Sequence, residues 1–202
     1  MADSDRSAGP AAGLALTCRP GKNGNTLLFP YKIENRGQVD VYAMHAMASV
    51  DPESGEAKAK ELAAVVILGP DGDAFVGKFA APLPTDRRVA VPIFPLARRV
   101  EAGGTLEAQL EISLPLAETS PYFADLTLRD YEIVDLKGVI FTIGYWIAGA
   151  DGLIANPADY APDLYSVVTR NTMRSARRLT QRFPTSGLQL FRRKDAFPRA
   201  IG

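Results

Sequence analysis

The stretch that decides the fold is residues 105–114, with the sequence TLEAQLEISL. Leu106 and Leu110 point to one side of an extended chain and Glu107 and Glu111 to the other, because successive side chains of a strand alternate between its two faces. We therefore predict a strand here, with an apolar face toward the core and an acidic face toward solvent.

The same period of two recurs along the chain before and after this strand. It predicts strands over residues 27–34, 39–47, 124–134 and 139–147, one beginning at residue 89, and a hairpin joining 63–68 to 74–79. Pro30 indicates that the first of these is an edge strand or carries a bulge. Short strands separated by Gly, Pro and Asp turns, without long amphipathic helices before residue 155, predict an all-β antiparallel sandwich.

Two segments carry a resemblance to a known group of domains. Residues 33–37 (IENRG) end an early strand, and residues 100–106 (VEAGGTL) lead into the later alternating strand. This pattern resembles the bacterial immunoglobulin-like and fibronectin-like sandwiches, among them the intracellular proteinase-inhibitor-like domains, in which an Asn-x-Gly turn and a Gly-containing turn hold these places. The resemblance implies an immunoglobulin-like sandwich used for binding rather than catalysis. No reactive segment can be matched, so no inhibitory residue is assigned.

The charges of the chain are divided unevenly along its length. Residues 170–202 hold nine of the 23 Lys and Arg side chains but a single acid, Asp195, whereas the first 169 residues carry 14 basic and 22 acidic side chains. A basic segment attached to an acidic body can fold back on that body, bind an anionic partner or lie on a membrane surface. The sequence leaves these three possibilities open.

The basic segment is also amphipathic when it is read with helical periodicity. The pattern predicts a helix from about residue 163 or 166 to residue 183, with apolar side chains within one arc and arginines on the opposite side, ended by Pro184 and Gly187. We expect three parts in the chain: a flexible lead over 1–13, the sandwich over 14–155, and a connection, basic helix and docking arm over 156–202. Beyond the helix, the arm mixes basic residues with large apolar ones: Leu188, Leu190, Phe191, Phe197 and Ile201.

Arginines and large apolar side chains together are typical of protein interfaces. The sequence therefore predicts a non-catalytic accessory or scaffold subunit that binds a protein complex with an acidic or mixed surface, with an anionic membrane surface as a further partner. The expected docking residues are Arg170, Arg174, Arg177, Arg178, Phe183, Phe191, Arg192 and Arg193. Nucleic acid is the weaker alternative, because the segment lacks the interleaved aromatic residues of single-strand binding and the body is acidic.

Catalysis has little support in the sequence. His45 is the single histidine and Cys18 the single cysteine, so a small cysteine-dependent enzyme or proteinase inhibitor could use only this pair, and the flanking signatures of cysteine enzymes are missing. We expect no cofactor and no metal. A lone cysteine, early acids that do not fit a secretory signal, and no apolar run of 18 residues favour a cytoplasmic location, either free or peripheral to a membrane complex.

Overall fold

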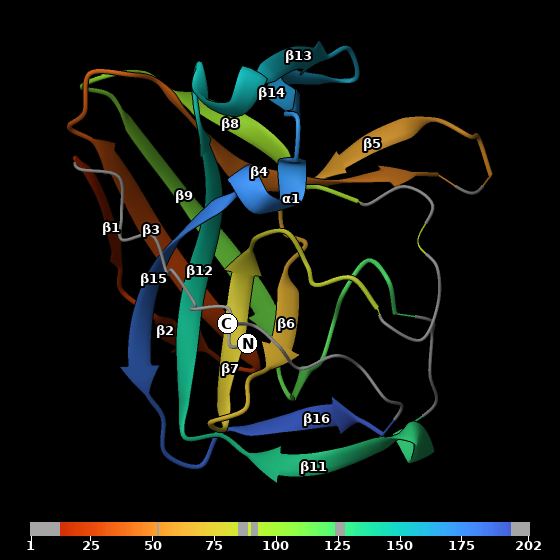
Figure 1. Ribbon diagram of the computed structural model, residues 1–202. Coiled ribbons are helices and arrows are strands. Elements are labelled where there is room, and N and C mark those ends of the chain that lie inside the picture. Colours follow the sequence, from red (N-terminus) through yellow and green to blue (C-terminus); the bar gives the residue numbers. More distant parts are fainter. Residues whose placement is uncertain (1–12, 52, 85–88, 90–92, 124–127, 195–202) are drawn as a thin grey trace, which may run out of the picture.

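The protein is described by a computed structural model over residues 13–51, 53–84, 89, 93–123 and 128–194, and within these residues it is an all-β fold (Figure 1). A four-stranded first sheet contains β1 (Leu14–Cys18), β2 (Gly21–Asn23), β3 (Thr26–Asn35) and β9 (Thr105–Ser113). A third, small sheet contains β10 (Leu116–Ala117), β11 (Tyr131–Asp135) and β16 (Gln189–Arg193).

The second sheet has nine strands and is called the large sheet. Its strands are β4 (Val41–Val50), β5 (Ala57–Lys60), β6 (Val65–Leu68), β7 (Asp73–Lys78), β8 (Leu96–Val100), β12 (Gly138–Ile147), β13 (Ile154–Ala158), β14 (Ala161–Val168) and β15 (Arg177–Pro184). Helical structure in the described residues is limited to η1 (Leu128–Asp130), η2 (Ala150–Gly152) and α1 (Thr172–Ser175).

Alternation located β3, β4, β6, β7, β9, β11 and β12, and it missed the other strands. The stretch that opened the sequence analysis is β9, which pairs along its whole length with β3, and the expected hairpin is formed by β6 and β7. The apolar strand over 139–147 is β12. Pro30 lies within β3, opposite the gap between β1 and β2, where its carbonyl accepts from the amide of Arg19 at 3.1 Å. A missing N–H costs little there, because no strand is paired on that side of Pro30.

The first sheet faces the large sheet across a shared apolar core. Phe29 of β3 stacks on Phe141 of β12, with ring centres 5.4 Å apart and planes 11° from parallel. Tyr31, two residues along β3, places its ring centre 5.3 Å from that of Phe141. All three side chains are buried, and they belong to one cluster that draws apolar residues from both sheets. Burial of this cluster is the main force that holds the two sheets together.

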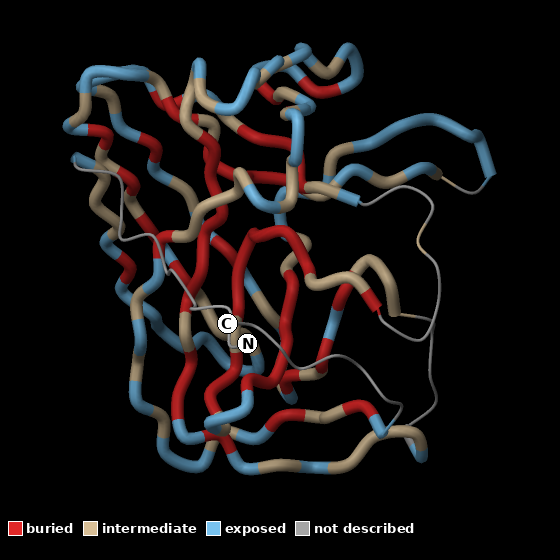
Figure 2. The backbone as a smooth tube through the Cα atoms, viewed as in Figure 1, coloured by how far each residue is buried: buried red, intermediate tan, exposed pale blue. Residues whose placement is uncertain are grey.

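β12 is buried on its opposite face as well. Trp146 has no exposed surface and packs in a second cluster with Phe79, Phe94 and Met173. Its indole N–H donates to the carbonyl of Thr172 at 3.2 Å, so loops and α1 cover this face of the sheet. Figure 2 shows the buried residues running along β12, β7 and β6, in contrast to the exposed hairpin of β5.

The large sheet is mixed, which corrects the expectation of a purely antiparallel sandwich. β7 runs parallel to β12, and β10 runs parallel to β16. The close pairing of β7 with β12 depends on Gly77, whose φ is 152°, because a Cβ atom there would lie 1.9 Å from the carbonyl oxygen of Thr142. Periodicity reports which side chains are buried and does not report strand direction, so the sequence held no sign of this arrangement.

The predicted basic helix over 166–183 is wrong. Residues 177–184 form β15, which pairs antiparallel with β12 from Tyr145 opposite Arg177 to Gly138 opposite Pro184. This pairing satisfies the backbone groups on one edge of β12, a requirement that outweighs helix formation by a short segment. Before it, β13 and β14 form a hairpin where a connection was expected, and α1 is a single turn.

The remaining residues after 155 also differ from the expected separate arm. β16 lies between β10 and β11, and the buried carboxylate of Glu118 accepts from the amide of Leu68 at 3.0 Å and from that of Arg193 at 2.8 Å. These bonds tie the third sheet to β6. Residues 51–62 contain β5, which pairs with the end of β4 as a hairpin.

Several expectations lie outside the described residues. They are the lead over 1–12, most of the strand beginning at residue 89, residues 124–127, and the end of the arm with Phe197, Arg199 and Ile201.

The Asn-x-Gly turn quoted in the sequence analysis joins three segments. Asn35 is buried, and its side-chain amide donates to the carbonyls of Val39 at 2.9 Å and Val100 at 3.1 Å. Its side-chain oxygen accepts from the amide of Gly37 at 3.1 Å. The asparagine therefore holds the end of β3 against the end of β8.

Replacing Phe141 tests the shared core. We expect Phe141→Ala to lower the free energy of unfolding by about 3–5 kcal/mol, because the substitution removes the ring that contacts both Phe29 and Tyr31 and leaves a cavity. The measurement is urea denaturation followed by tryptophan fluorescence. Ile133→Ala is the control, since this side chain is 60% exposed and should change stability by no more than about 0.5 kcal/mol. Equal effects of the two substitutions would contradict the packing described here.

Candidate functional site

Two arginines of the basic segment are exposed and free of ion pairs. Arg170 follows β14 and Arg174 lies in α1. Among the described residues no carboxylate oxygen lies within 4.0 Å of either guanidinium group, whereas other arginines of the chain have such partners. These two charges are therefore available to an anionic group from outside the chain.

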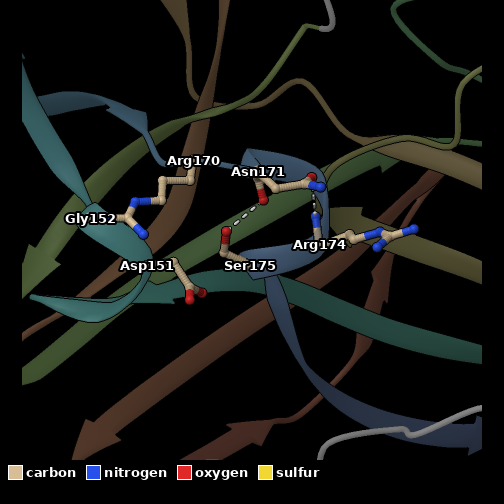
Figure 3. A pocket seen from close by; sticks show the side chains of 6 residues that line it. All are labelled: Asp151, Gly152, Arg170, Asn171, Arg174 and Ser175. Carbon is tan, nitrogen blue, oxygen red and sulfur yellow. Dashed lines mark hydrogen bonds between the residues drawn. The ribbon is translucent and has the colours of Figure 1, made fainter.

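Both arginines border one open, polar pocket of about 600 Å³. Its lining is Asp151, Gly152, Arg170, Asn171, Arg174 and Ser175. Figure 3 shows that the Arg170 side chain lies over Gly152 and that Arg174 points away from the other labelled side chains, so the two guanidinium groups stand at different sides of the pocket. The arrangement fits an extended acidic segment that contacts both groups better than a single small anion.

The loop that carries these arginines is held by its own hydrogen bonds. The side chain of Asn171 accepts from the amide of Arg174 at 3.2 Å, and the hydroxyl of Ser175 lies 2.6 Å from that of Thr169. The amide of Arg170 donates to the carbonyl of Asp151 at 3.2 Å. These contacts fix the backbone under the pocket, so little ordering of the loop is needed when a partner binds.

Three further predicted docking residues belong to β15 and are partly buried. Arg177 pairs with Tyr145 at the start of the strand. Arg178 places its guanidinium carbon 5.4 Å from the ring centre of Phe79, and burial lowers its pKa. Phe183 packs against the core shared by the first sheet and the large sheet. These side chains contribute to the body of the protein.

The last three predicted docking residues lie in β16. Phe191 is partly buried beside Tyr131, with ring centres 6.2 Å apart, and Arg192 forms an ion pair with Glu132. Arg193 is buried and places its guanidinium carbon 4.2 Å from the ring centre of Phe123. β16 and α1 lie at different ends of the molecule (Figure 1), so the eight predicted residues do not form one surface.

Another arginine of the segment binds the acidic body directly. Arg182 donates to both carboxylate oxygens of Asp73, at 2.7 Å and 3.0 Å. The Arg182 guanidinium group lowers the pKa of Asp73 below its ordinary value. This bidentate pair joins β15 to the start of β7 across β12. It shows that part of the charge division read from the sequence is neutralised within the molecule.

Cys18 and His45 lack the properties of a catalytic pair. Cys18 is buried, and burial raises the pKa of its thiol to about 12, which keeps it protonated and weakly nucleophilic. His45 is buried too, and burial together with the charges of Lys78 and Arg98 lowers its pKa to about 4. Neither group is poised for acid–base chemistry near neutral pH as a pair.

Searches of protein-family models, curated proteins and solved structures gave no match to this chain. Within the described ranges, no helix has the length and apolar composition needed to cross a bilayer, and no three His, Cys, Asp or Glu side chains gather as metal ligands. A function for the chain therefore has to be inferred from its own geometry.

Sequence reasoning found the two exposed arginines but not the rest of their pocket. Asp151, Asn171 and Ser175 lie in turn-like sequence, where Asp, Asn and Ser are expected for conformational reasons alone. Their position beside the two arginines depends on how the turn at Asp151 packs against the turn after β14, which residue types do not reveal.

Substitution of Arg182 tests whether the basic segment is part of the body. We expect Arg182→Gln to lower the midpoint of urea denaturation, because Asp73 would lose its cationic partner. Arg170→Gln serves as the matched control and should leave the midpoint unchanged, since Arg170 has no ion-pair partner among the described residues. If the two variants unfolded at the same urea concentration, the contact between Arg182 and Asp73 would have no structural role.

His45 gives a pH dependence of stability. Its pKa in the folded protein, about 4, lies below the ordinary value of 6.5, so the unfolded chain binds the proton more tightly over this interval. The free energy of unfolding should therefore rise with pH from about 4 to 6.5. In His45→Gln we expect the slope to be smaller by about one proton, as measured by urea denaturation across this range. Identical slopes would show that the histidine is not held neutral.

Proposed function

We propose that this chain is a non-catalytic accessory or scaffold subunit that binds a larger protein assembly through the exposed part of its basic segment. The observation that carries the proposal is the pocket bordered by Arg170 and Arg174, two cations without an ion-pair partner in the described part of the chain, on a loop fixed by hydrogen bonds. Their partner is an acidic segment of another protein, whose carboxylates would form charge-assisted hydrogen bonds with both guanidinium groups.

The all-β architecture supports a binding role. Two sheets that face each other across a common core give a rigid frame, and the pocket lies on loops and turns at its surface. We propose that the frame is a variant of the immunoglobulin-like sandwich, extended by β13 to β16. The buried, protonated thiol of Cys18 favours a non-enzymatic role and fits a cytoplasmic protein, either free or attached to the cytoplasmic face of a membrane complex.

Charge reversal at the pocket tests the proposal. We expect the full chain to bind a fluorescent oligoglutamate peptide in an anisotropy titration, and Arg170→Glu combined with Arg174→Glu to weaken that binding by about tenfold or more. Lys22→Glu is the control, because Lys22 is an exposed cation on β2, in the first sheet, and should leave the affinity unchanged.

Two results would contradict the proposal. One is an equal loss of peptide affinity in the control and in the double variant, which would indicate general electrostatics rather than this pocket. The other is tighter binding of a single-stranded oligonucleotide than of the peptide, with an affinity that collapses as salt is raised, which would favour the nucleic-acid alternative.

A further inference from the structure

A second group of polar side chains lies between the first sheet and the large sheet, remote in sequence from the pocket of Arg170. We call it the polar cluster. Its members are Tyr31 of β3, His45 of β4, Lys78 at the end of β7, Arg98 of β8, and Glu61, which follows β5. Tyr31, His45 and Lys78 expose only 4%, 1% and 1% of their surface, a burial that is rare for ionisable residues.

The strand pairing changes in the part of the large sheet where the cluster lies. β12 pairs with β4 as far as Tyr145 opposite Ala43, and with β7 from Ile143 opposite Lys78. His45, two residues after Ala43, therefore lies close to the point where β4 leaves β12 and β7 takes its place as the neighbour of β12. The register of β4 with β8 also shifts between Met44 and Ala46, so His45 occupies a bulge. Bulges of this kind direct a side chain away from the regular ladder and are common beside functional sites.

The buried polar atoms of the cluster lack hydrogen-bond partners within the described residues. The hydroxyl of Tyr31 and both ring nitrogens of His45 have none, and neither does Nε of Arg98. Leaving such groups unsatisfied is costly, and native proteins keep few of them outside functional sites. The hydroxyl, the ammonium, the guanidinium and one nitrogen of the neutral imidazole can all donate, so an acceptor group can satisfy most of these atoms, while the other imidazole nitrogen is itself an acceptor.

Glu61 supplies an acceptor only at long range. One carboxylate oxygen lies 3.6 Å from Nε2 of His45 and the other lies 3.6 Å from Nη2 of Arg98, both beyond hydrogen-bonding distance. The Glu61 side chain is 55% exposed, and that of Arg98 is 33% exposed, so these two residues form the solvent-facing side of the cluster. Glu61 is therefore the most exposed member of the cluster, and His45, Tyr31 and Lys78 are more deeply buried.

The charges set the class of ligand. Burial lowers the pKa of Lys78 to about 8, so the ammonium is still mostly protonated at neutral pH, and His45 is neutral. With Arg98 positive and Glu61 negative, the cluster carries one excess positive charge. A monoanion that takes the place of the Glu61 carboxylate leaves this charge unchanged. A carboxylate also matches the chemistry of Glu61, the group that already faces these donors.

We propose that the polar cluster is a binding site for a small carboxylate, with the side chain of Glu61 as an intramolecular competitor that moves aside when the ligand enters. The ligand accepts hydrogen bonds from Lys78, His45, Tyr31 and Arg98. This site is separate from the pocket of Arg170 and Arg174, so it stands or falls independently of the function proposed above.

The test is a titration of the full chain with sodium acetate, followed by the NMR shifts of backbone amides at Tyr31, His45 and Lys78, with sodium chloride at the same ionic strength as reference. We expect saturable binding with a Kd of roughly 1 mM, as suits a ligand of so few atoms. Lys78→Met should weaken binding by about tenfold or more, because it removes a charge-assisted donor.

The decisive variant is Glu61→Gln, which removes the competing carboxylate. We expect it to tighten acetate binding by about two- to fivefold, the strength of an exposed ion pair. Glu56→Gln removes an exposed carboxylate from the same hairpin and should not change the affinity. A purely structural role for the cluster predicts no gain in acetate affinity in Glu61→Gln. This variant therefore decides the question even if Lys78→Met fails to fold.

Three results would overturn the proposal. The first is the absence of saturable acetate binding, and the second is an identical response to chloride. The third is tighter binding of inorganic phosphate than of acetate, which would assign the cluster to phosphate instead.

Discussion

The structure depends on the pairing of β12, a strand that is buried on both faces and hydrogen-bonded along both edges. β15 pairs with one edge from Gly138 to Tyr145, while β7 and then β4 pair with the other. Its side chains point alternately toward two cores. Phe141 packs in the core shared with the first sheet, and Trp146 packs in the core that α1 helps to cover. A strand in this position cannot keep an open edge, because unpaired backbone groups in the interior are expensive. The segment that closes the edge is the basic one.

This requirement explains how a positively charged segment serves two purposes. Where it runs along β12 and β11, its cations meet the acidic body, as in the pairs of Arg182 with Asp73 and of Arg192 with Glu132. Where the chain turns between β14 and β15, the backbone is held by hydrogen bonds and Arg170 and Arg174 remain unpaired. Some of the positive charges of the segment are therefore neutralised within the sheets, and those of Arg170 and Arg174 remain at one turn.

Alternating apolar residues located strands such as β9 and β12. These strands bury one or both faces, so apolar side chains occupy the buried positions of their sequence. The same reasoning failed for β15. Leu179 and Phe183 are four residues apart, a spacing that fits one face of a helix as well as one face of a strand, and the arginines between them fit both patterns. Only the free edge of β12 decides between the two, and that is a tertiary property. The polar cluster could not be predicted either. His45, Lys78 and Arg98 come from three different strands, and no local sequence pattern indicates the order of these strands in the sheet.

The central claim is that, within the described residues, the basic segment contributes β15 and β16 to the sheets, while Arg170 and Arg174 at the turn before β15 have no ion-pair partner. Native-state hydrogen exchange measures this most directly, because the rates report how each strand opens. The amides of β15 that bond to β12 should be protected nearly as strongly as those of β12 itself, and the exposed amides around Arg170 should exchange faster. Exchange of the whole of β15 at the rate of an unstructured chain, with β12 still protected, would contradict the account.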